Sequence, residues 1–274
     1  MEPVVRVPGL AVRGGEARPI TRALPEEAAV AMVYDGSTQA VLMATPRDLE
    51  DFGVGFSLTE GIVSAPDEID SLEVVEQGPG IEVRMWLAGD RGAALAGRRR
   101  FMAGPVGCGL CGLDSLGAAL RPVPPVAGEA RLSAADVEAA VAALRSFQPL
   151  HDETRAVHAA AFWRPGAGIV AAFEDVGRHN ALDKLVGALA RRGEAAAGGA
   201  VVLTSRISID MVQKAAVAGA GVVVAVSAPT AHAVRLAGEA GMTLVALARE
   251  DGFCVFTHPG RIGTRNETER RDVA

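Results

Sequence analysis

The stretch that decides the fold is "AVVLTSRISIDMVQKAAVAGAGVVVAVSAPTAHAVRLAGEAGMTLVALAR", residues 200–249. It contains three short apolar runs without polar alternation, at 200–205, 222–227 and 242–248. Such runs indicate strands that are buried on both faces. The segments between them, 210–218 and 230–240, have helical character, and each is followed by glycine, a typical helix stop. Strands that alternate with helices predict an α/β fold with crossover helices.

The residues before and after this stretch extend the same pattern. We expect strands at 157–162, 168–173 and 253–257 and a helix at 180–191. A further helix is expected at 133–147, because Ser133 and Asp136 form a start signal before spaced apolar residues. Prolines and a glycine at 122–128 mark a linker. Residues 126–262 are therefore predicted to form one C-terminal α/β domain.

Residues 1–125 are predicted to form a smaller N-terminal α+β domain. Asp35-Gly36 is a hairpin turn signal between the extended segments 22–34 and 39–44. A helix is expected from Pro46 to Gly61, and two more strands at 69–77 and 81–87. Residues 1–20 are expected to be irregular, and the charged residues 263–274 to form a disordered tail.

Composition excludes several classes of protein. The 274 residues carry a net charge of −6 and only 4% aromatics, which does not suit a protein that coats nucleic acid. No uninterrupted apolar run of about 18 residues occurs, so no membrane span is expected. No signal-peptide pattern is evident, and three cysteines are too few for a disulfide framework. These features favour a cytoplasmic protein.

Two of the cysteines lie close together in "GPVGCGLCGLDSL", residues 104–116. A structural zinc site needs four ligands, and the only other cysteine is Cys254, so we expect no metal here. A thioredoxin-like dithiol would begin a helix, whereas glycines flank Cys108 and Cys111 on both sides. A mobile loop that carries one reactive thiol and a redox-active pair both stay open. The basic run 98–100 is either a solvated loop or a cationic patch beside the thiols.

Polar clusters follow the predicted strands of the C-terminal domain at 174–180, 204–208 and 227–230. Helix N-termini offer free N–H groups to anions, and arginine binds phosphate in a bidentate manner. These clusters are also compatible with ordinary helix caps and ion pairs. Together they suggest an anionic, nucleotide-like ligand, with candidate contacts from Arg178, His179, Asn180, Arg206 and Ser208.

The chain resembles the FdhD family, the formate dehydrogenase accessory sulfurtransferases, over about residues 25–262. The resemblance begins at "EDVGRHNALDKLVG" (174–187) and includes "CGLCGLDSL" (108–116). It continues in the order of the family's motifs through "SRISIDMVQKAAVAG" (205–219) and "FCVFTHPGRI" (253–262). The resemblance implies a cytidine-deaminase-like α/β/α C-terminal domain with a mixed sheet, and a homodimer.

The same resemblance implies the activity. A cysteine desulfurase would donate sulfur to a persulfide on Cys108, with Cys111 as a helper. The sulfur would pass to the molybdenum or tungsten bis-pterin guanine dinucleotide cofactor, with formate dehydrogenase as the client enzyme. The segment that the resemblance associates with this cofactor is Phe253, Cys254, Val255, Phe256, Thr257 and His258. No permanently bound metal is expected.

Two alternatives from other classes are open. A thiol–disulfide oxidoreductase would cycle Cys108 and Cys111 between dithiol and disulfide. A molybdenum-cofactor chaperone without catalytic activity would bind the pterin dinucleotide and move no sulfur. Such a chaperone would keep its function after loss of both cysteines, which separates it from a sulfur carrier.

Overall fold

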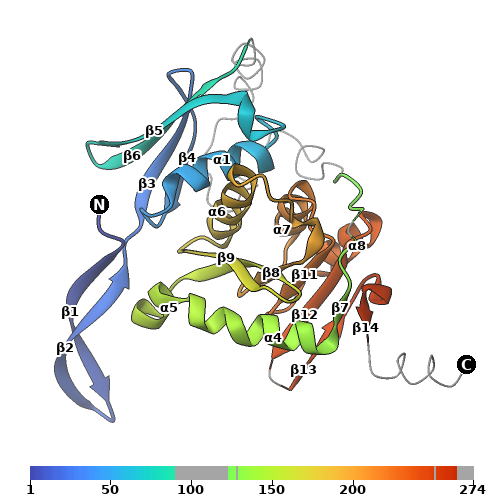
Figure 1. The fold of residues 1–274 in the computed structure, drawn as a ribbon. Helices are drawn as coiled ribbons and strands as arrows, with labels where there is room; N and C mark the ends of the chain where they lie inside the picture. Colours follow the sequence, from blue (N-terminus) through green and yellow to red (C-terminus); the bar gives the residue numbers. More distant parts are fainter. Residues whose placement is uncertain (90–122, 128, 250, 264–274) are drawn as a thin grey trace, which may run out of the picture.

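A computed structural model of the chain describes residues 1–89, 123–127, 129–249 and 251–263. Within these residues the strands form one six-stranded sheet, one four-stranded sheet and two two-stranded pairs (Figure 1). The predicted cysteine loop and residues 264–274 of the predicted tail lie outside the described residues. The α/β class expected from residues 200–249 is confirmed.

The six-stranded sheet is the centre of the C-terminal half. Its strands, in spatial order, are β13 (Gly252–Val255), β12 (Thr243–Arg249), β11 (Val222–Ala225), β10 (Ala200–Leu203), β8 (His158–Arg164) and β9 (Gly168–Asp175). Strands β10, β11 and β12 are parallel, and their neighbours pair antiparallel. The parallel strands are joined by α7 (Ile209–Val217) and α8 (Ala231–Glu239). The sheet is therefore mixed, as expected.

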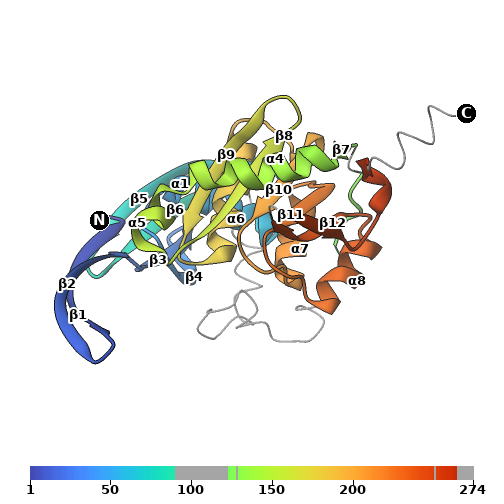
Figure 2. The ribbon, with the colours of Figure 1, turned by 90° about the horizontal axis from the view of Figure 1, so that it is seen from below.

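Helices cover both faces of this sheet and make three layers (Figure 2). Successive side chains of a strand point to opposite faces. Val201 and Leu203 of β10 pack with α7, α8 and α6 (Arg178–Arg191). Ala200 and Val202 of the same strand pack instead with α4 (Ala134–Leu144). Because every face of β10 is covered, its sequence shows no polar alternation.

Smaller elements complete the described C-terminal half. Helix α4 begins with the predicted capping box, in which Ser133 and Asp136 bond each other's backbone N–H groups. Helix α5 (Pro149–Thr154) follows α4, and β7 (Leu132–Ser133) pairs in parallel with β14 (Ile262–Gly263). No helix among the described residues is long and apolar enough to cross a membrane.

The four-stranded sheet forms the N-terminal half. Its spatial order is β4 (Ser37–Ala44), β3 (Ala28–Tyr34), β6 (Gly80–Leu87) and β5 (Ile69–Gln77). The predicted Asp35-Gly36 turn joins β3 to β4, and both of its residues have positive φ angles. Helix α1 (Leu49–Thr59) covers one face of the sheet and buries Phe52 against it.

The expectation that residues 1–20 are irregular is wrong. Strands β1 (Val4–Arg13) and β2 (Glu16–Pro25) pair along their whole length as a two-stranded ribbon that projects from the body (Figure 1). Gly14 and Gly15 make the turn with φ angles of 58° and 87°. The prolines at 8 and 19 obscured the pattern, because proline lacks a ladder N–H and is confined to strand edges.

Helices α1 and α6 cross at very close range and join the two halves (Figure 1). A Cβ added to Gly55 would lie 1.8 Å from the Asp183 carbonyl oxygen, and one added to Gly187 would lie 1.9 Å from the Asp51 carbonyl oxygen. Only glycine fits at either position, since the obstructing atoms belong to the backbone.

A buried cation joins α1, α6 and α7 beside this crossing. Lys214 Nζ donates to Glu60 Oε1 at 2.9 Å, to Thr59 Oγ1 at 2.9 Å and to both carboxylate oxygens of Asp183 at 3.0 Å. The side chains of Lys214 and Asp183 are 4% and 1% exposed. Buried charges are tolerated only when they are paired and hydrogen-bonded in this way.

We predict that Lys214→Met destabilises the fold by about 3–5 kcal/mol, because it leaves Asp183 buried without its cation. Burial already raises the pKa of Asp183 to about 6. Urea unfolding measures the loss. The double variant Lys214→Met/Asp183→Leu should lose less than Lys214→Met alone, because the fully buried carboxylate of Asp183 is removed together with its cation. A Lys214→Met chain within about 1 kcal/mol of the wild type would contradict the assignment.

Candidate functional site

The N-termini of α6 and α7 lie side by side at the edge of the six-stranded sheet that is formed by the carboxyl ends of β9 and β10. Helix α6 follows β9 and α7 follows β10, so both begin where a strand ends. Neither Gly177 nor Ser208, the two N-cap residues, makes a side-chain capping bond. The imidazole of His179 contacts the carboxylate of Asp210 across the gap, which places the two first turns in contact.

Apart from the facing atoms of His179 and Asp210, two buried polar atoms at this edge have no hydrogen-bond partner within the described part of the chain. They are Arg178 Nε and Ser208 Oγ. Unsatisfied buried donors are uncommon in proteins, and each calls for a ligand or water. Uncapped helix N-termini add free N–H groups and partial positive charge. This edge is therefore suited to an anionic group such as a phosphate.

Asp175 holds the first turn of α6 in place. It is fully buried and receives Lys184 Nζ at 2.6 Å, Asn180 Nδ2 at 2.9 Å and the Gly177 N–H at 2.8 Å. It also accepts the backbone N–H of Thr45 at 3.0 Å, from the segment that precedes α1. The position of Arg178 and His179 is thus fixed jointly by both halves of the chain.

The cluster 174–180 therefore divides into structural and site residues. Glu174 accepts the N–H groups of Leu150 and His151 and caps α5. Asn180 is buried and donates to the Met43 carbonyl as well as to Asp175, so it supports the site from behind. Arg178 and His179 remain at the strand-end edge. Glu174 and Asn180 therefore follow the other interpretation of this cluster, in which its polar residues cap helices and bond one another within the fold.

The other predicted contacts separate into two places. Ser208 lies at the edge with Arg178, and Arg206 is exposed beside it in the sequence. The segment 253–258 lies elsewhere, along the lateral edge of the sheet, where β13 is the terminal strand. There Phe253 and Val255 pack toward α4, while Cys254, Phe256 and His258 are exposed.

Two side chains of that segment are held by the backbone. Thr257 Oγ1 donates to the Met242 carbonyl at 2.7 Å and accepts the Leu244 N–H at 2.9 Å. His258 Nε2 lies 2.8 Å from the Gly238 carbonyl oxygen. The structure does not bring residues 253–258 together with Arg178 and Ser208. A ligand that touches both sets must extend across the sheet.

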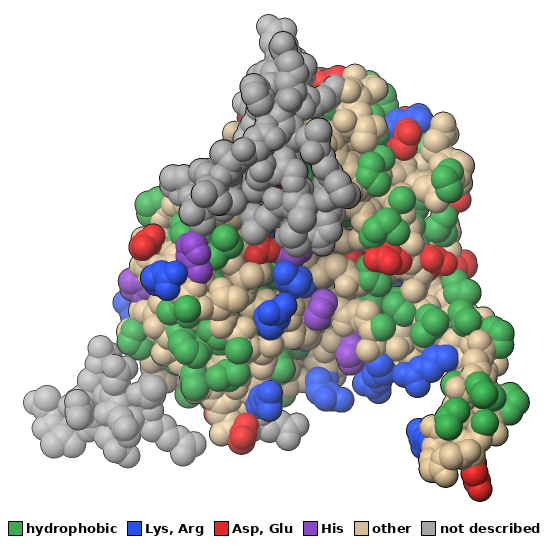
Figure 3. Space-filling model, turned by 180° about the vertical axis from the view of Figure 1, so that it is seen from behind, with side chains coloured by type: hydrophobic (Ala, Val, Ile, Leu, Met, Phe, Trp, Pro, Cys, Tyr) green, Lys and Arg blue, Asp and Glu red, His purple; other side chains and the backbone are tan. Residues whose placement is uncertain are grey.

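The candidate thiols Cys108 and Cys111, and the basic run 98–100, lie outside the described residues. Among the described residues, no group of three or more His, Cys, Asp or Glu side chains is placed to hold a metal ion. Lys, Arg and His side chains gather across the middle and lower part of one face of the molecule (Figure 3). That face is locally cationic despite the net charge of −6.

Burial controls the protonation of the histidines near this edge. Burial lowers the pKa of His179 to about 4; Asp210 opposes this shift, while Arg178 and Lys214 add to it. Burial also lowers the pKa of His158, and the neighbouring charges of Arg178 and His151 lower it further. Both imidazoles are therefore neutral at pH 7, and His179 can donate its Nε2 proton to Asp210.

We predict that His179 makes the fold less stable in acid. Its folded pKa of about 4 lies below the usual value of about 6.5, so the unfolded chain binds the proton more strongly. This contribution is complete above about pH 6.5 and is lost as the pH falls toward 4, by up to about 3 kcal/mol. Urea unfolding between these pH values measures it. His179→Gln should flatten this part of the profile, and an NMR titration of His179 near pH 6.5 or above would contradict it.

Several residues that build this edge carry no signal in the sequence. Lys184 lies within a helix, Thr45 precedes another helix, and Lys214 and Asp183 are spaced like ordinary surface residues. The sequence offers one hint. Lys184 lies four residues after Asn180, on the same face of an amphipathic helix as its apolar residues, where a charged side chain is unusual. Some of their partners, however, are more than 100 residues away: Lys184 donates to the Thr45 carbonyl and Lys214 to the Thr59 hydroxyl.

Comparison with known proteins places this chain in one family. The family model described as the FdhD/NarQ family matches residues 25–263. A sulfur carrier protein FdhD from Agrobacterium fabrum is 52% identical over 258 residues, covering 94% of this chain and 95% of the relative. One from Brucella abortus is 53% identical over 243 residues, covering 88% of this chain and 90% of the relative.

A solved structure supports the same family assignment. A protein from Desulfotalea psychrophila described as a formate dehydrogenase accessory protein superposes with a TM-score of 0.76 at 25% identity. The match covers 95% of this chain and 99% of that protein. The similarity therefore extends over both sheets and the strand-end edge, and by sequence and by fold the chain belongs to the FdhD/NarQ family.

Proposed function

We propose that this chain carries sulfur, as a persulfide on Cys108, in the maturation of formate dehydrogenase. The observation that carries the proposal is the similarity at more than half identity, over 94% of the chain, to a protein named as a sulfur carrier. The pair Cys108 and Cys111 lies within the matched residues 25–263.

Loading is a sulfur transfer without net redox change. The Cys108 thiolate attacks the outer sulfur of a persulfide on a cysteine desulfurase. The sulfur–sulfur bond of the donor breaks, the donor cysteine leaves as a thiolate, and a persulfide forms on Cys108. Only the thiolate is nucleophilic, with an ordinary cysteine pKa near ~8.5 that nearby cations lower. The basic run 98–100 is a candidate source of that charge.

Cys111 is the proposed helper in release. Its thiolate attacks the inner sulfur of the persulfide, a Cys108–Cys111 disulfide forms, and the outer sulfur leaves as hydrosulfide. The two cysteines supply the two electrons that reduce the outer sulfur. A cellular thiol reductant must then restore the pair before the next cycle.

The proposed recipient is the molybdenum or tungsten bis-pterin guanine dinucleotide cofactor, bound as a client before it enters formate dehydrogenase. Its phosphates match the uncapped starts of α6 and α7 and the unpartnered Arg178 and Ser208. Residues 253–258 stay a second proposed contact, with the Phe256 side chain exposed. We expect a homodimer in the cytoplasm.

The test is sulfur loading in vitro. The purified chain is incubated with a cysteine desulfurase and L-cysteine, and mass spectrometry locates the adduct of one sulfur atom. We expect it on Cys108 in the wild type and in Cys111→Ser. Sulfur on Cys111 instead of Cys108, or no sulfur adduct at all, would contradict the proposal. Rapid insulin reduction that needs both thiols would favour the oxidoreductase.

A further inference from the structure

The ribbon of β1 and β2 projects from the body of the molecule and exposes apolar side chains (Figure 1). Among the described residues it carries five of the fourteen large apolar side chains that are exposed, namely Val5, Val7, Leu10, Val12 and Leu24. An isolated two-stranded ribbon is marginally stable in water, and exposed apolar patches mark surfaces that bind proteins. The ribbon therefore has the properties of an arm that packs on another surface.

The two faces of the ribbon have different surroundings. One face is held by the chain itself, since Ala23 is buried there and Nη2 of its cross-strand neighbour Arg6 lies 3.2 Å from Glu153 Oε1 of α5. Arg18 and Arg22 lie on the opposite face; both are exposed, and neither is in an ion pair within the described part of the chain. We call this opposite face the arm face; from the pairing register, it consists of Val5, Val7, Ala11, Arg18, Arg22 and Leu24.

Prolines limit how a partner can bind the ribbon. Pro8 interrupts β1 and Pro19 interrupts β2, and a proline offers no N–H group to a further strand. Prolines in edge strands prevent another chain from adding itself to a sheet as a strand. A partner is therefore expected to meet the side chains of the arm face rather than the strand edges.

The four-stranded sheet offers a surface that complements the arm face. Helix α1 covers one face of this sheet, and Val41, Met43 and Trp86 are exposed on the other, which we call the outer face. Asp67 and Asp70 lie where β5 begins, and the residue after Asp70 pairs with Trp86. Both aspartates are exposed, and neither is in an ion pair among the described residues. The outer face thus combines apolar side chains with free negative charge.

Opposite net charges mark these two surfaces. The ribbon, residues 4–25, has four arginines and one glutamate, a net charge of +3. Residues 26–89, which include the four-stranded sheet, have thirteen acidic and two basic residues, a net charge of −11. The ribbon points away from its own sheet (Figure 1), so the sheet that it can meet belongs to a second copy. Complementary potentials attract and orient such surfaces.

We propose that a second copy of this chain occupies the arm face, and that each ribbon lies on the outer face of the other copy's four-stranded sheet. The exchange is isologous, so one two-fold axis generates both contacts and closes the dimer. Trp86 packs against the apolar residues of the arm face, and the two arginines of that face meet Asp67 and Asp70. A ten-residue strand spans about 33 Å, which is long enough for this reach. The inference rests on the homodimer of the proposed function.

Sedimentation equilibrium of the full chain measures the dissociation constant of the dimer. Arg18→Glu/Arg22→Glu should raise this constant at least about 100-fold, because each reversed ribbon then meets an acidic sheet. Asp67→Lys/Asp70→Lys should have the same effect, because each arginine-bearing ribbon then meets lysines. An equimolar mixture of the two double variants should dimerise within about tenfold of the wild type, because both contacts again join opposite charges.

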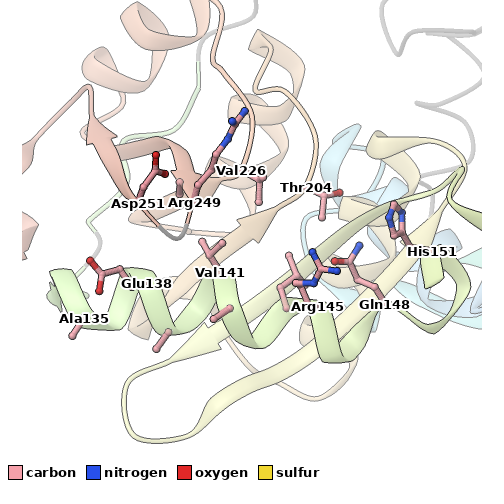
Figure 4. A pocket seen from close by; sticks show the side chains of 14 residues that line it. Ala135, Glu138, Val141, Arg145, Gln148, His151, Thr204, Val226, Arg249 and Asp251 are labelled. Atoms are coloured by element: carbon pink, nitrogen blue, oxygen red, sulfur yellow. The ribbon is translucent and has the colours of Figure 1, made fainter.

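Arg192→Glu/Arg249→Glu is the matched control, because it reverses the same number of charges outside both surfaces. Arg192 is exposed at the end of α6, and Arg249 is exposed at the end of β12, where it lines a groove beside α4 (Figure 4). This control should dimerise as the wild type does. Circular dichroism confirms that every variant is folded before the comparison.

Three outcomes overturn the proposal: a wild-type chain that stays monomeric, an Arg18→Glu/Arg22→Glu chain that dimerises as the wild type does, and a mixture of folded variants that does not pair. Sulfur loading of the same chains separates this inference from the proposed function. A chain that loads sulfur on Cys108 and dimerises regardless of the reversal overturns the arm contact alone. Charge-dependent dimers that never load sulfur overturn the sulfur carrier and leave the arm contact standing.

Discussion

Cells that make only the Cys108→Ser chain are expected to have no active formate dehydrogenase. A serine hydroxyl is not ionised at neutral pH and forms no persulfide, so the first transfer cannot occur. The exposed Cys254 lies on β13, outside the glycine-rich stretch that carries Cys108. The measurement is formate oxidation by extracts of a deletion strain that carries the variant.

Cys111→Ser is the matched comparison for this experiment, since it removes the other thiol of the same stretch. We expect it to retain sulfur loading and to give reduced, not absent, formate dehydrogenase activity. Immunoblots must show equal amounts of all chains. Wild-type activity with Cys108→Ser would mean that the chain acts as a cofactor chaperone and moves no sulfur.

The Gly187→Ala chain is expected to lose about 3 kcal/mol of stability or more, although alanine is the better helix former. The new Cβ would lie 1.9 Å from the Asp51 carbonyl oxygen and 2.7 Å from the Gly55 nitrogen. Both are backbone atoms, so α1 and α6 must separate, and overpacked sites of this kind cost about 1–3 kcal/mol or more. Separation would also strain the Lys214 contacts with Thr59 and Asp183.

Gly238→Ala in α8 is the matched control. Its Cβ would meet only Thr257 Cγ2, at 3.7 Å, which is ordinary van der Waals contact. That variant should gain up to about 1 kcal/mol from helix propensity. Calorimetric melting compares the two, with roughly 2–4 °C expected for each kcal/mol in a chain of this size. If both substitutions shift the melting temperature alike, the close crossing of α1 and α6 is not real.

Local sequence patterns were sufficient for most of the helices and strands. The apolar runs at 200–205, 222–227 and 242–248 became β10, β11 and β12, because a strand buried on both faces needs no polar alternation. Local patterns were insufficient at β1 and β2. Prolines interrupt these strands, and their side chains are mostly exposed, so no alternation of buried and exposed residues marks them.

The candidate site was only half predictable. Arg178, His179 and Ser208 follow strand ends, and residues at the ends of neighbouring strands meet in any sheet of this kind. Asn180 has the same position in the sequence but supports the site from behind, since its amide is taken by Met43 and Asp175.

The sequence by itself determined the α/β class, the order of the elements and the pair of thiols at Cys108 and Cys111, because each depends on residues close together in the chain. Tertiary structure alone decided which polar residues are free to bind. Asp175 and Asp183 are held by lysines within the fold, while Arg178 Nε and Ser208 Oγ have no partner among the described residues. The physical reason is that a buried charge must be fully hydrogen-bonded, and here Thr45 and Thr59 complete the bonds of the two lysines from more than 100 residues away.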